Sequence, residues 1–124
     1  MAKSVKKILI IEDELPLAKA LSLKLKKSGF SPVVAPNGEQ ALQLLLTEKF
    51  GLIVLDLVMP KVDGFLVLEE LRARGDTTPV IVTSNLSQAE DIKRVKELGA
   101  KEYFVKSDTP ISKLVGYIKD TLRV

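Results

Sequence analysis

Short apolar runs alternate with longer amphipathic stretches along almost the whole chain. Runs rich in branched aliphatic residues predict strands at residues 7–11, 30–35, 51–55, 79–83 and 102–105. Between and after them, apolar side chains recur every three or four residues, which predicts helices at residues 17–28, 38–46, 64–74, 88–98 and 111–122. Gly29 is the expected C-cap of the first helix, and Asn37 is the expected N-cap of the second.

The strict alternation of strands and helices predicts an α/β fold, with one five-stranded parallel sheet and helices on both faces. Right-handed crossovers leave few arrangements, and the flavodoxin-like strand order 2-1-3-4-5 is the commonest for such units. The length of 124 residues suits one domain. Because no linker or repeat interrupts the pattern, we expect residues 1–124 to form a single domain with no output domain.

The composition excludes several kinds of chemistry. The chain has no cysteine and no histidine, which excludes disulfides, thiol catalysis, imidazole metal sites and Ser-His-Asp triads. An aromatic content of 5% and a net charge of +3 argue against a nucleic-acid partner. No apolar run reaches the roughly 18 to 20 residues of a membrane span, and the N-terminus does not resemble a signal peptide. We therefore expect a cytoplasmic protein with no membrane partner.

Ionisable side chains gather where this fold places its ligands, outside the carboxyl ends of the strands at the reversal of strand order. In the order 2-1-3-4-5 that place lies between the first and third strands, whose ends carry Glu12, Asp13 and Asp56. Such carboxylates repel each other unless a cation or protons share the site, and an all-oxygen ligand set favours Mg²⁺. Ser84 and Lys106 follow the fourth and fifth strands. The combination suits a phosphoryl group held on a carboxylate oxygen.

Each of these residues alone has an ordinary explanation. An aspartate after an apolar strand is usually a capping or loop residue, a lone lysine is usually solvated, and a lone serine is uninformative. Their joint placement at one edge of the sheet is what favours a functional site. Other classes fit less well: an aspartyl phosphatase needs a second acid where this chain has Val58, and a P-loop needs a glycine-rich turn after the first strand.

The sequence resembles the receiver domains of two-component response regulators over essentially its full length. Four motifs carry the resemblance: Ile11-Glu12-Asp13; Leu55-Asp56-Leu57-Val58-Met59-Pro60 with Asp63-Gly64; Leu98-Gly99-Ala100; and Tyr103-Phe104-Val105-Lys106. As a set they are highly specific, whereas any one of them alone is not. The resemblance is to stand-alone, chemotaxis-regulator-like receivers, and it implies the receiver fold.

The resemblance also implies a set of roles at the site. Asp56 would accept a phosphoryl group from a histidine kinase or a histidine phosphotransfer protein. Asp13, Asp56 and the backbone carbonyl of Val58 would hold Mg²⁺, with Glu12 helping through water. Lys106 would pair with a phosphoryl oxygen.

Two further positions match the switch residues of the family. Spacing from Lys106 and from Pro79 favours Ser84 over Thr83 as the switch hydroxyl, and strand alternation turns Thr83 to the opposite face. Tyr103 stands at the aromatic switch position, three residues before Lys106, although an ordinary half-buried strand tyrosine is an alternative interpretation.

The implied output is a change in the surface of the fourth helix, fifth strand and fifth helix. That surface would bind a downstream protein target, a separate output domain or a second copy of the chain. The protein would then be a switch that phosphorylates and dephosphorylates itself, not an enzyme. The alternative is a degenerate receiver that acts as a phosphorylation-independent interaction module.

Three features depart from the family pattern. Ser107 follows Lys106 where the family usually has proline, so the usual cis peptide is in doubt. Asn85 follows the switch hydroxyl where the family favours alanine. Val58 and Leu86 are both apolar, so neither can orient an attacking water, and we expect slow spontaneous loss of phosphate.

Overall fold

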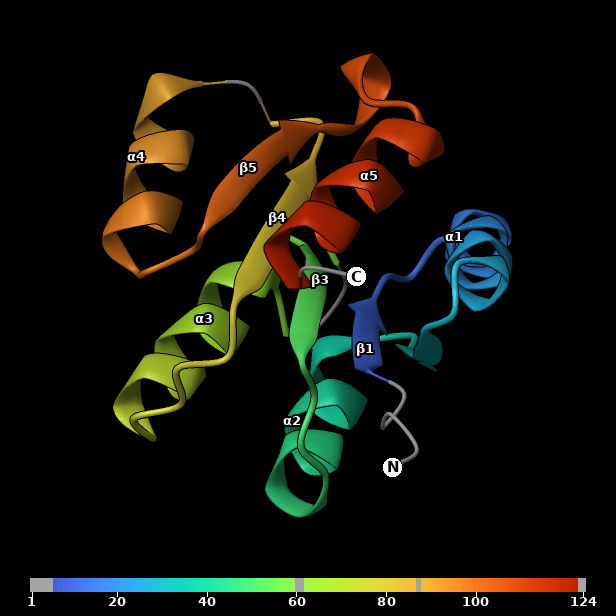
Figure 1. The fold of residues 1–124 in the computed structure, drawn as a ribbon. Coiled ribbons are helices and arrows are strands. Elements are labelled where there is room, and N and C mark those ends of the chain that lie inside the picture. Colours follow the sequence, from blue (N-terminus) through green and yellow to red (C-terminus); the bar gives the residue numbers. More distant parts are fainter. Residues whose placement is uncertain (1–5, 60–61, 87, 123–124) are drawn as a thin grey trace.

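The computed structural model describes residues 6–59, 62–86 and 88–122; the motif residue Pro60 lies outside them. Strands and α-helices alternate along the chain (Figure 1). The elements are β1 (Lys7–Ile11), α1 (Leu15–Lys27), β2 (Ser31–Ala35), α2 (Gly38–Thr47), β3 (Leu52–Asp56), α3 (Gly64–Ala73), β4 (Val80–Ser84), α4 (Ala89–Glu97), β5 (Glu102–Val105) and α5 (Ile111–Leu122). A 3₁₀ turn at Lys106–Asp108, which the sequence pattern does not predict, joins β5 to α5. Within the described residues, no helix is both long and apolar enough to cross a membrane.

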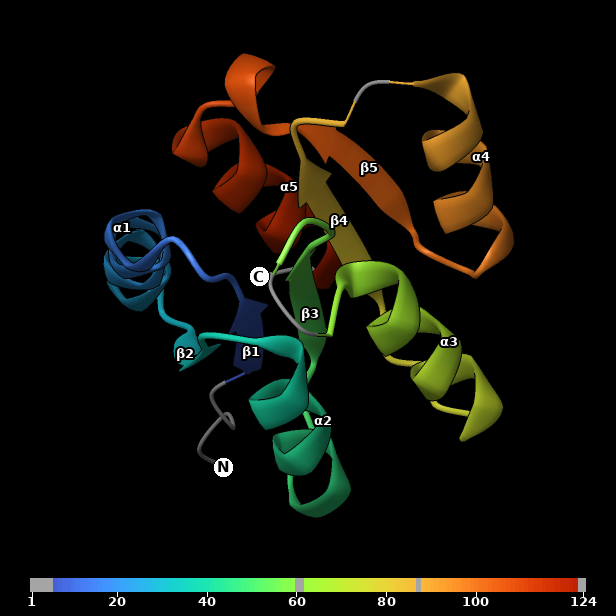
Figure 2. The same ribbon diagram turned by 180° about the vertical axis from the view of Figure 1, so that it is seen from behind.

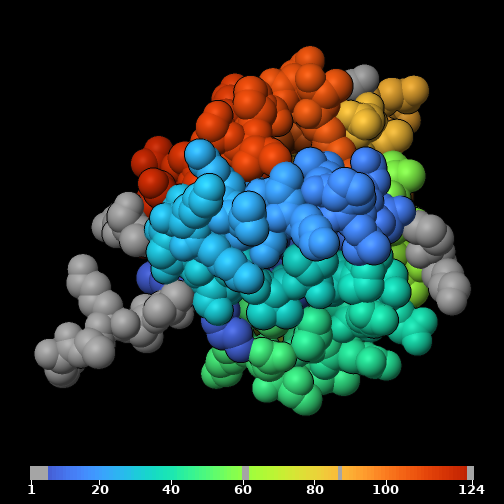
Figure 3. All heavy atoms as spheres, turned by 90° about the vertical axis from the view of Figure 1, so that its right-hand side faces the viewer, coloured from blue at the N-terminus to red at the C-terminus, as the bar shows by residue number. Residues whose placement is uncertain are grey.

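The five strands form one parallel sheet in the order β2-β1-β3-β4-β5, which confirms the predicted topology. Helices α1 and α5 cover one face, and α2, α3 and α4 cover the other. Accordingly, α5 lies in front of the strands in Figure 1 and behind them in Figure 2. Figure 3 shows α1, in blue, lying across one side of the molecule next to the orange and red C-terminal segment, in line with the packing of α1 against α5.

The central strands are buried on both faces, which explains their continuous apolar runs. In β1, Ile8 and Ile10 pack toward α1 and α5, whereas Leu9 and Ile11 pack toward the other three helices. All five residues of β3 are buried in the same alternating way. Because apolar surface is removed from water on both sides, the sheet centre anchors the fold, and polar groups are placed at the strand ends.

Three predicted strands begin one residue later than expected: β2 at Ser31, β3 at Leu52 and β4 at Val80. Pro79 precedes β4 because it has no N–H to donate to the ladder, although its carbonyl accepts from the Ile53 N–H at 2.9 Å. Gly51 likewise precedes β3. At its other end β4 extends to Ser84, which pairs with Val105 of β5.

The predicted helix caps are confirmed in one case and displaced in the other. Asn37 caps α2 by accepting a hydrogen bond from the Gln40 N–H at 2.8 Å. The C-cap of α1 is Ser28 instead of Gly29, which follows it with φ +92°. Gly29 takes the next position because a left-handed residue commonly ends a helix there.

Helix α3 begins in direct contact with the end of β3. A Cβ atom at Gly64 would lie 2.6 Å from the Asp56 carbonyl oxygen and 2.7 Å from the Leu57 Cα, which is closer than non-bonded atoms approach. The Gly64 N–H donates to the Leu57 carbonyl at 2.9 Å. The Asp63 side chain caps the helix by accepting from the Leu66 N–H at 3.0 Å. Glycine at position 64 therefore allows α3 to start against the strand that carries Asp56.

We expect Gly64→Ala to lower the free energy of unfolding by about 1–3 kcal/mol, because the backbone of β3 or α3 has to shift to admit a methyl group. Urea denaturation measures this change. Gly116→Ala in the middle of α5 is the matched control, since a Cβ there meets nothing within 4 Å, and it should raise stability by roughly 0.5–1 kcal/mol. Equal effects of the two substitutions would contradict the account of Gly64.

Candidate functional site: an acidic crevice with a buried lysine

Three carboxylates converge at the carboxyl edge of the sheet, as the sequence predicts. Glu12 and Asp13 directly follow β1, and Asp56 is the last residue of the neighbouring strand β3. One carboxylate oxygen from each of the three residues lies within 4.8 Å of the other two. Glu12 and Asp56 are buried, so water screens their charges poorly.

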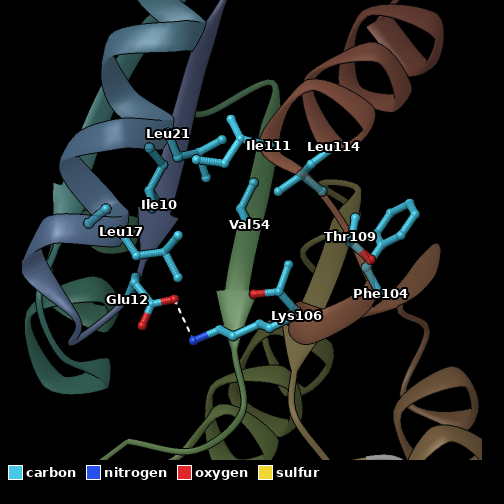
Figure 4. Close-up of a pocket in the computed structure, with 12 residues that line it drawn as sticks. Ile10, Glu12, Leu17, Leu21, Val54, Phe104, Lys106, Thr109, Ile111 and Leu114 are labelled. Carbon is cyan, nitrogen blue, oxygen red and sulfur yellow. Dashed lines mark ion pairs between the residues drawn. The ribbon is translucent and has the colours of Figure 1, made fainter.

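Lys106 reaches from the end of β5 across the strand ends to Glu12, as Figure 4 shows, and it also contacts Asp56. Its Nζ atom lies 2.7 Å from Glu12 Oε1 and 3.2 Å from Asp56 Oδ2. The Lys106 side chain is only 12% exposed, so these are largely buried ion pairs. Nζ also lies 3.4 Å from Oε1 of the exposed Glu14, a contact that the sequence analysis missed, although the run Glu12-Asp13-Glu14 offered a signal for it.

The Glu12–Lys106 ion pair borders a mostly apolar cavity of about 60 Å³ between the sheet and helices α1 and α5 (Figure 4). Ile10, Val54 and Leu114 are among the side chains that line it. This apolar lining keeps one side of the ion pair in a low-dielectric environment, which strengthens the attraction and makes an unpaired charge costly.

The protonation of Asp56 and Lys106 reflects this burial. Burial, and next the charge of Glu12, raise the pKa of Asp56 from its ordinary value of 3.8 to about 7, although Lys106 acts in the opposite direction. Burial by itself would lower the pKa of Lys106. The hydrogen bond to Glu12 and the charge of Asp56 outweigh that effect and leave this pKa above its ordinary value. Lys106 is therefore a permanent cation facing an acid with weakened ionisation.

On its other side Asp56 faces a solvent-open hollow of about 380 Å³. The hollow is lined by Asp13, Glu14, Asp56, Val58, Asn85, Leu86 and Lys106. Asp56 Oδ1 accepts a hydrogen bond from the Val58 N–H at 3.3 Å. The carboxylate is thus held at both oxygens, by an ammonium and by a backbone amide, while still bordering the hollow.

The donor set fits a hard divalent cation. Glu12, Asp13 and Asp56 offer oxygen ligands within reach of one ion. When Glu12, Asp13 and Asp56 are all ionised, the single ammonium of Lys106 balances one of their three negative charges and leaves two, which is the charge of one divalent ion. Val58, whose backbone carbonyl is the fourth predicted ligand, is among the residues that line the same hollow.

The two candidate hydroxyls face opposite sides of the sheet, as strand alternation predicts. Thr83 pairs with Asp56 in the β3–β4 register and lines the apolar cavity on the α1–α5 side. Ser84 is fully buried, and its Oγ atom accepts a hydrogen bond from the Leu86 N–H at 3.1 Å. The role of Ser84 as a switch hydroxyl stays a prediction.

Tyr103 is packed inward in the core beneath α4 instead of being half-buried. The residue is 9% exposed, and its hydroxyl donates a hydrogen bond to the Leu86 carbonyl. Burial raises the pKa of the Tyr103 phenol, so the hydroxyl stays protonated and can donate. This bond connects β5 directly to the loop that follows Ser84.

The structure also connects two of the departures from the family pattern. The Ser107 N–H donates to Asn85 Oδ1 at 3.1 Å. Among the described residues no peptide bond is cis, so the Lys106–Ser107 bond is trans. Asn85 and Ser107 depart from the family pattern separately, and nothing in the sequence indicates that they are in contact.

Comparison with known proteins agrees with this geometry. Residues 8–119 match the family described as the response regulator receiver domain. The chain is 40% identical over 117 residues to "Probable transcriptional regulator ycf27" of Porphyridium aerugineum, covering 94% of this chain and 48% of that protein. The receiver domain of the Francisella response regulator 1452 superposes with a TM-score of 0.87 at 31% identity, covering 92% of this chain and 93% of that one.

A CheY-like receiver domain protein from Methanospirillum hungatei shares the fold, with a TM-score of 0.90 at 23% identity over 97% of this chain and 95% of that one. The chain belongs to the response regulator receiver domain family of two-component signalling. It spans about half the length of the curated relatives that it matches.

The raised pKa of Asp56 predicts a pH-dependent effect of Asp56→Asn. The folded chain binds more protons than the unfolded chain between about pH 4 and pH 7, so wild-type stability falls as the pH rises through that range. The asparagine variant cannot ionise at this position, so its stability does not fall for this reason as the pH rises. Its free energy of unfolding in EDTA should exceed that of the wild type by about 1–3 kcal/mol at about pH 8, and by much less at about pH 4.

Urea denaturation at both pH values measures the difference. Asp120→Asn, at an exposed position of α5, is the control and should follow the wild type at each pH. A constant difference between Asp56→Asn and the wild type across this pH range would contradict the elevated pKa.

Proposed function

We propose that this receiver is a phosphoacceptor in a two-component or phosphorelay system, with Asp56 taking a phosphoryl group in a Mg²⁺-dependent reaction. The observation that supports this most directly is the setting of the Asp56 carboxylate. It borders an open hollow, contacts the Lys106 ammonium at 3.2 Å, and lies in a carboxylate cluster with excess negative charge. A purely structural ion pair would not need that excess charge beside solvent.

The proposed reaction is a direct transfer from a phosphohistidine of a histidine kinase or a histidine phosphotransfer protein. An Asp56 oxygen attacks phosphorus, and a new O–P bond forms as the P–N bond breaks and its electron pair returns to the imidazole. Lys106 pairs with a phosphoryl oxygen and neutralises part of its charge. Glu12, Asp13, Asp56 and the Val58 carbonyl would hold Mg²⁺, which supplies further positive charge toward the phosphoryl oxygens.

The proposed switch runs through the loop after β4. Ser84 Oγ accepts from the Leu86 N–H in the structure, and its hydroxyl proton would be donated to a phosphoryl oxygen. The Leu86 carbonyl also accepts from the Tyr103 hydroxyl, so movement of this loop changes the packing of Tyr103. In this scheme phosphorylation biases an equilibrium between two arrangements of the loop and of Tyr103.

Two surfaces would serve the proposed partners. Leu15 and Val58 are both 58% exposed. Val58 lines the hollow and Leu15 follows the lining residue Glu14, so both lie where a phosphohistidine donor has to approach. The surface of α4, β5 and α5 would bind a downstream protein, a separate output domain or a second copy of the chain. In this scheme the chain's own Asp56 is the group that is phosphorylated and dephosphorylated, so we propose a switch and not an enzyme.

Phosphorylation is tested by intact-mass spectrometry after incubation with acetyl phosphate. We expect a Mg²⁺-dependent gain of one phosphoryl group in the wild type and none in Asp56→Asn, because only an ionised Asp56 oxygen can attack. Asp120→Asn serves as a matched control and should be phosphorylated like the wild type. Uptake without Mg²⁺, or in Asp56→Asn, would contradict the proposed site.

A wild type that is folded but takes up no phosphoryl group from either acetyl phosphate or a phosphorylated histidine phosphotransfer protein would favour the alternative, a degenerate receiver that binds partners without phosphorylation. The two donors differ in size and docking, so failure with both removes poor donor access as the explanation.

The lifetime of the phosphorylated form gives a separate prediction. Val58 and Leu86 line the hollow, and neither side chain can hydrogen-bond an attacking water, so we expect the phosphoryl group to persist for minutes instead of seconds. Val58→Asn places a carboxamide beside the hollow and should shorten the lifetime by roughly 3- to 10-fold. Val58→Leu is the apolar control, and an equal shortening in both variants would contradict the role of water orientation.

A further inference from the structure

One hydrogen bond joins the loops that follow β4 and β5 at the hollow. The Ser107 N–H donates to the side-chain oxygen of Asn85 at 3.1 Å. Asn85 is the residue after Ser84 at the end of β4, and Ser107 is the residue after Lys106. The bond therefore connects the segment carrying the site hydroxyl to the segment carrying the site ammonium. We call this hydrogen bond the strap.

The strap depends on both residues that form it. Asparagine offers an amide oxygen as acceptor, which alanine lacks, and a residue other than proline is needed at position 107 to supply the N–H. Because the partner of Asn85 is a backbone donor, the accepting atom has to be the oxygen and not the nitrogen of the amide. A single substitution at either position therefore removes the strap.

The position of Asn85 places the strap at the mouth of the site. Asn85 lines the hollow of about 380 Å³ together with Asp56 and Lys106. Both strap residues are exposed, so water competes for the hydrogen bond and its contribution is modest.

Other contacts of the same loop run in different directions. The Leu86 N–H donates to Ser84 Oγ at 3.1 Å, within the loop itself. The Leu86 carbonyl accepts from the Tyr103 hydroxyl, on the side of the core beneath α4. The strap instead reaches the loop beside Lys106, so it limits how far the two walls of the hollow separate.

We infer that the strap holds the loops after β4 and β5 together at the opening of the hollow. It thereby slows the access of small molecules to Asp56. This inference rests on the proposed function. Asn85 is a positioning residue that acts through the loop geometry. Both acetyl phosphate on its way to Asp56 and water on its way to the aspartyl phosphate have to enter between these walls. In the hydrolysis step, water oxygen bonds to phosphorus, the Asp56 O–P bond breaks, and inorganic phosphate leaves with the carboxylate regenerated.

The first test needs no phosphorylation. Hydrogen exchange of the Ser107 amide, followed by NMR, should be about 2- to 10-fold faster in Asn85→Ala than in the wild type, because the amide loses its acceptor. Amides in the middle of α5 should exchange at unchanged rates, which shows that the fold is intact. An unchanged Ser107 exchange rate in Asn85→Ala would overturn the strap, whether or not Asp56 is phosphorylated.

The second test is a double-mutant cycle on phosphoryl transfer, measured by intact mass with acetyl phosphate and Mg²⁺. Asn85→Ala and Ser107→Pro should each speed both uptake and loss of the phosphoryl group by about 2- to 10-fold. The double variant should be no faster than either single variant, because both remove the same bond. Ser107→Ala keeps the N–H and should behave as the wild type.

The outcomes separate the strap from the proposed function. Additive effects in the double variant, or no acceleration in Asn85→Ala, would overturn the inference while leaving phosphorylation of Asp56 in place. A wild type that takes up no phosphoryl group would refute the proposed function, and with it the role of the strap in phosphoryl traffic. If Ser107→Pro fails to fold, Asn85→Ala with Ser107→Ala as its control still decides the matter.

Discussion

The buried lysine is the centre on which the site depends. Lys106 stands at the end of an edge strand, yet its ammonium lies 2.7 Å from a carboxylate that follows β1, on the far side of β3 and β4. Buried ion pairs of this kind add little net stability, because desolvation offsets the attraction, but removing one partner is costly. The pairs with Glu12 and Asp56 therefore tie the position of the segment after β5 to the charge state of the acids. Any added charge at Asp56 competes directly for the same ammonium.

The fold was predictable because the central strands are buried on both faces. Continuous apolar runs gave the strand positions, and the alternation with helices gave the topology, so the convergence of Glu12, Asp13 and Asp56 followed from the strand order. The strand ends were less predictable: Pro79 lies outside β4 because it lacks an N–H, and Ser84 lies inside because it pairs with Val105. The hydrophobic pattern of a segment does not show which residues of a neighbouring strand it will pair with.

The finer contacts of the site could not be read from the sequence. Glu14 near Lys106, Tyr103 against the Leu86 carbonyl and Asn85 against the Ser107 N–H all join residues from different segments. Each depends on loop conformation after a strand, where no hydrophobic periodicity operates. The resemblance to receiver domains assigned roles to single positions, whereas the contact between Asn85 and Ser107, which depart from the family pattern, is visible only in the structure.

The close packing of Gly64 against the backbone of Asp56 makes one side of the site more rigid than the other. No methyl group fits between this residue and the Asp56 carbonyl oxygen. The backbone of Asp56 and the start of α3 are therefore held in one fixed arrangement by close packing. The segments after β4 and β5, by contrast, are held across the hollow by hydrogen bonds and ion pairs, which exchange partners at far lower cost than a close-packed backbone contact. The Asp56 backbone is therefore the rigid side of the hollow, and the segments bearing Ser84 and Lys106 form the side that is held by weaker, reversible contacts.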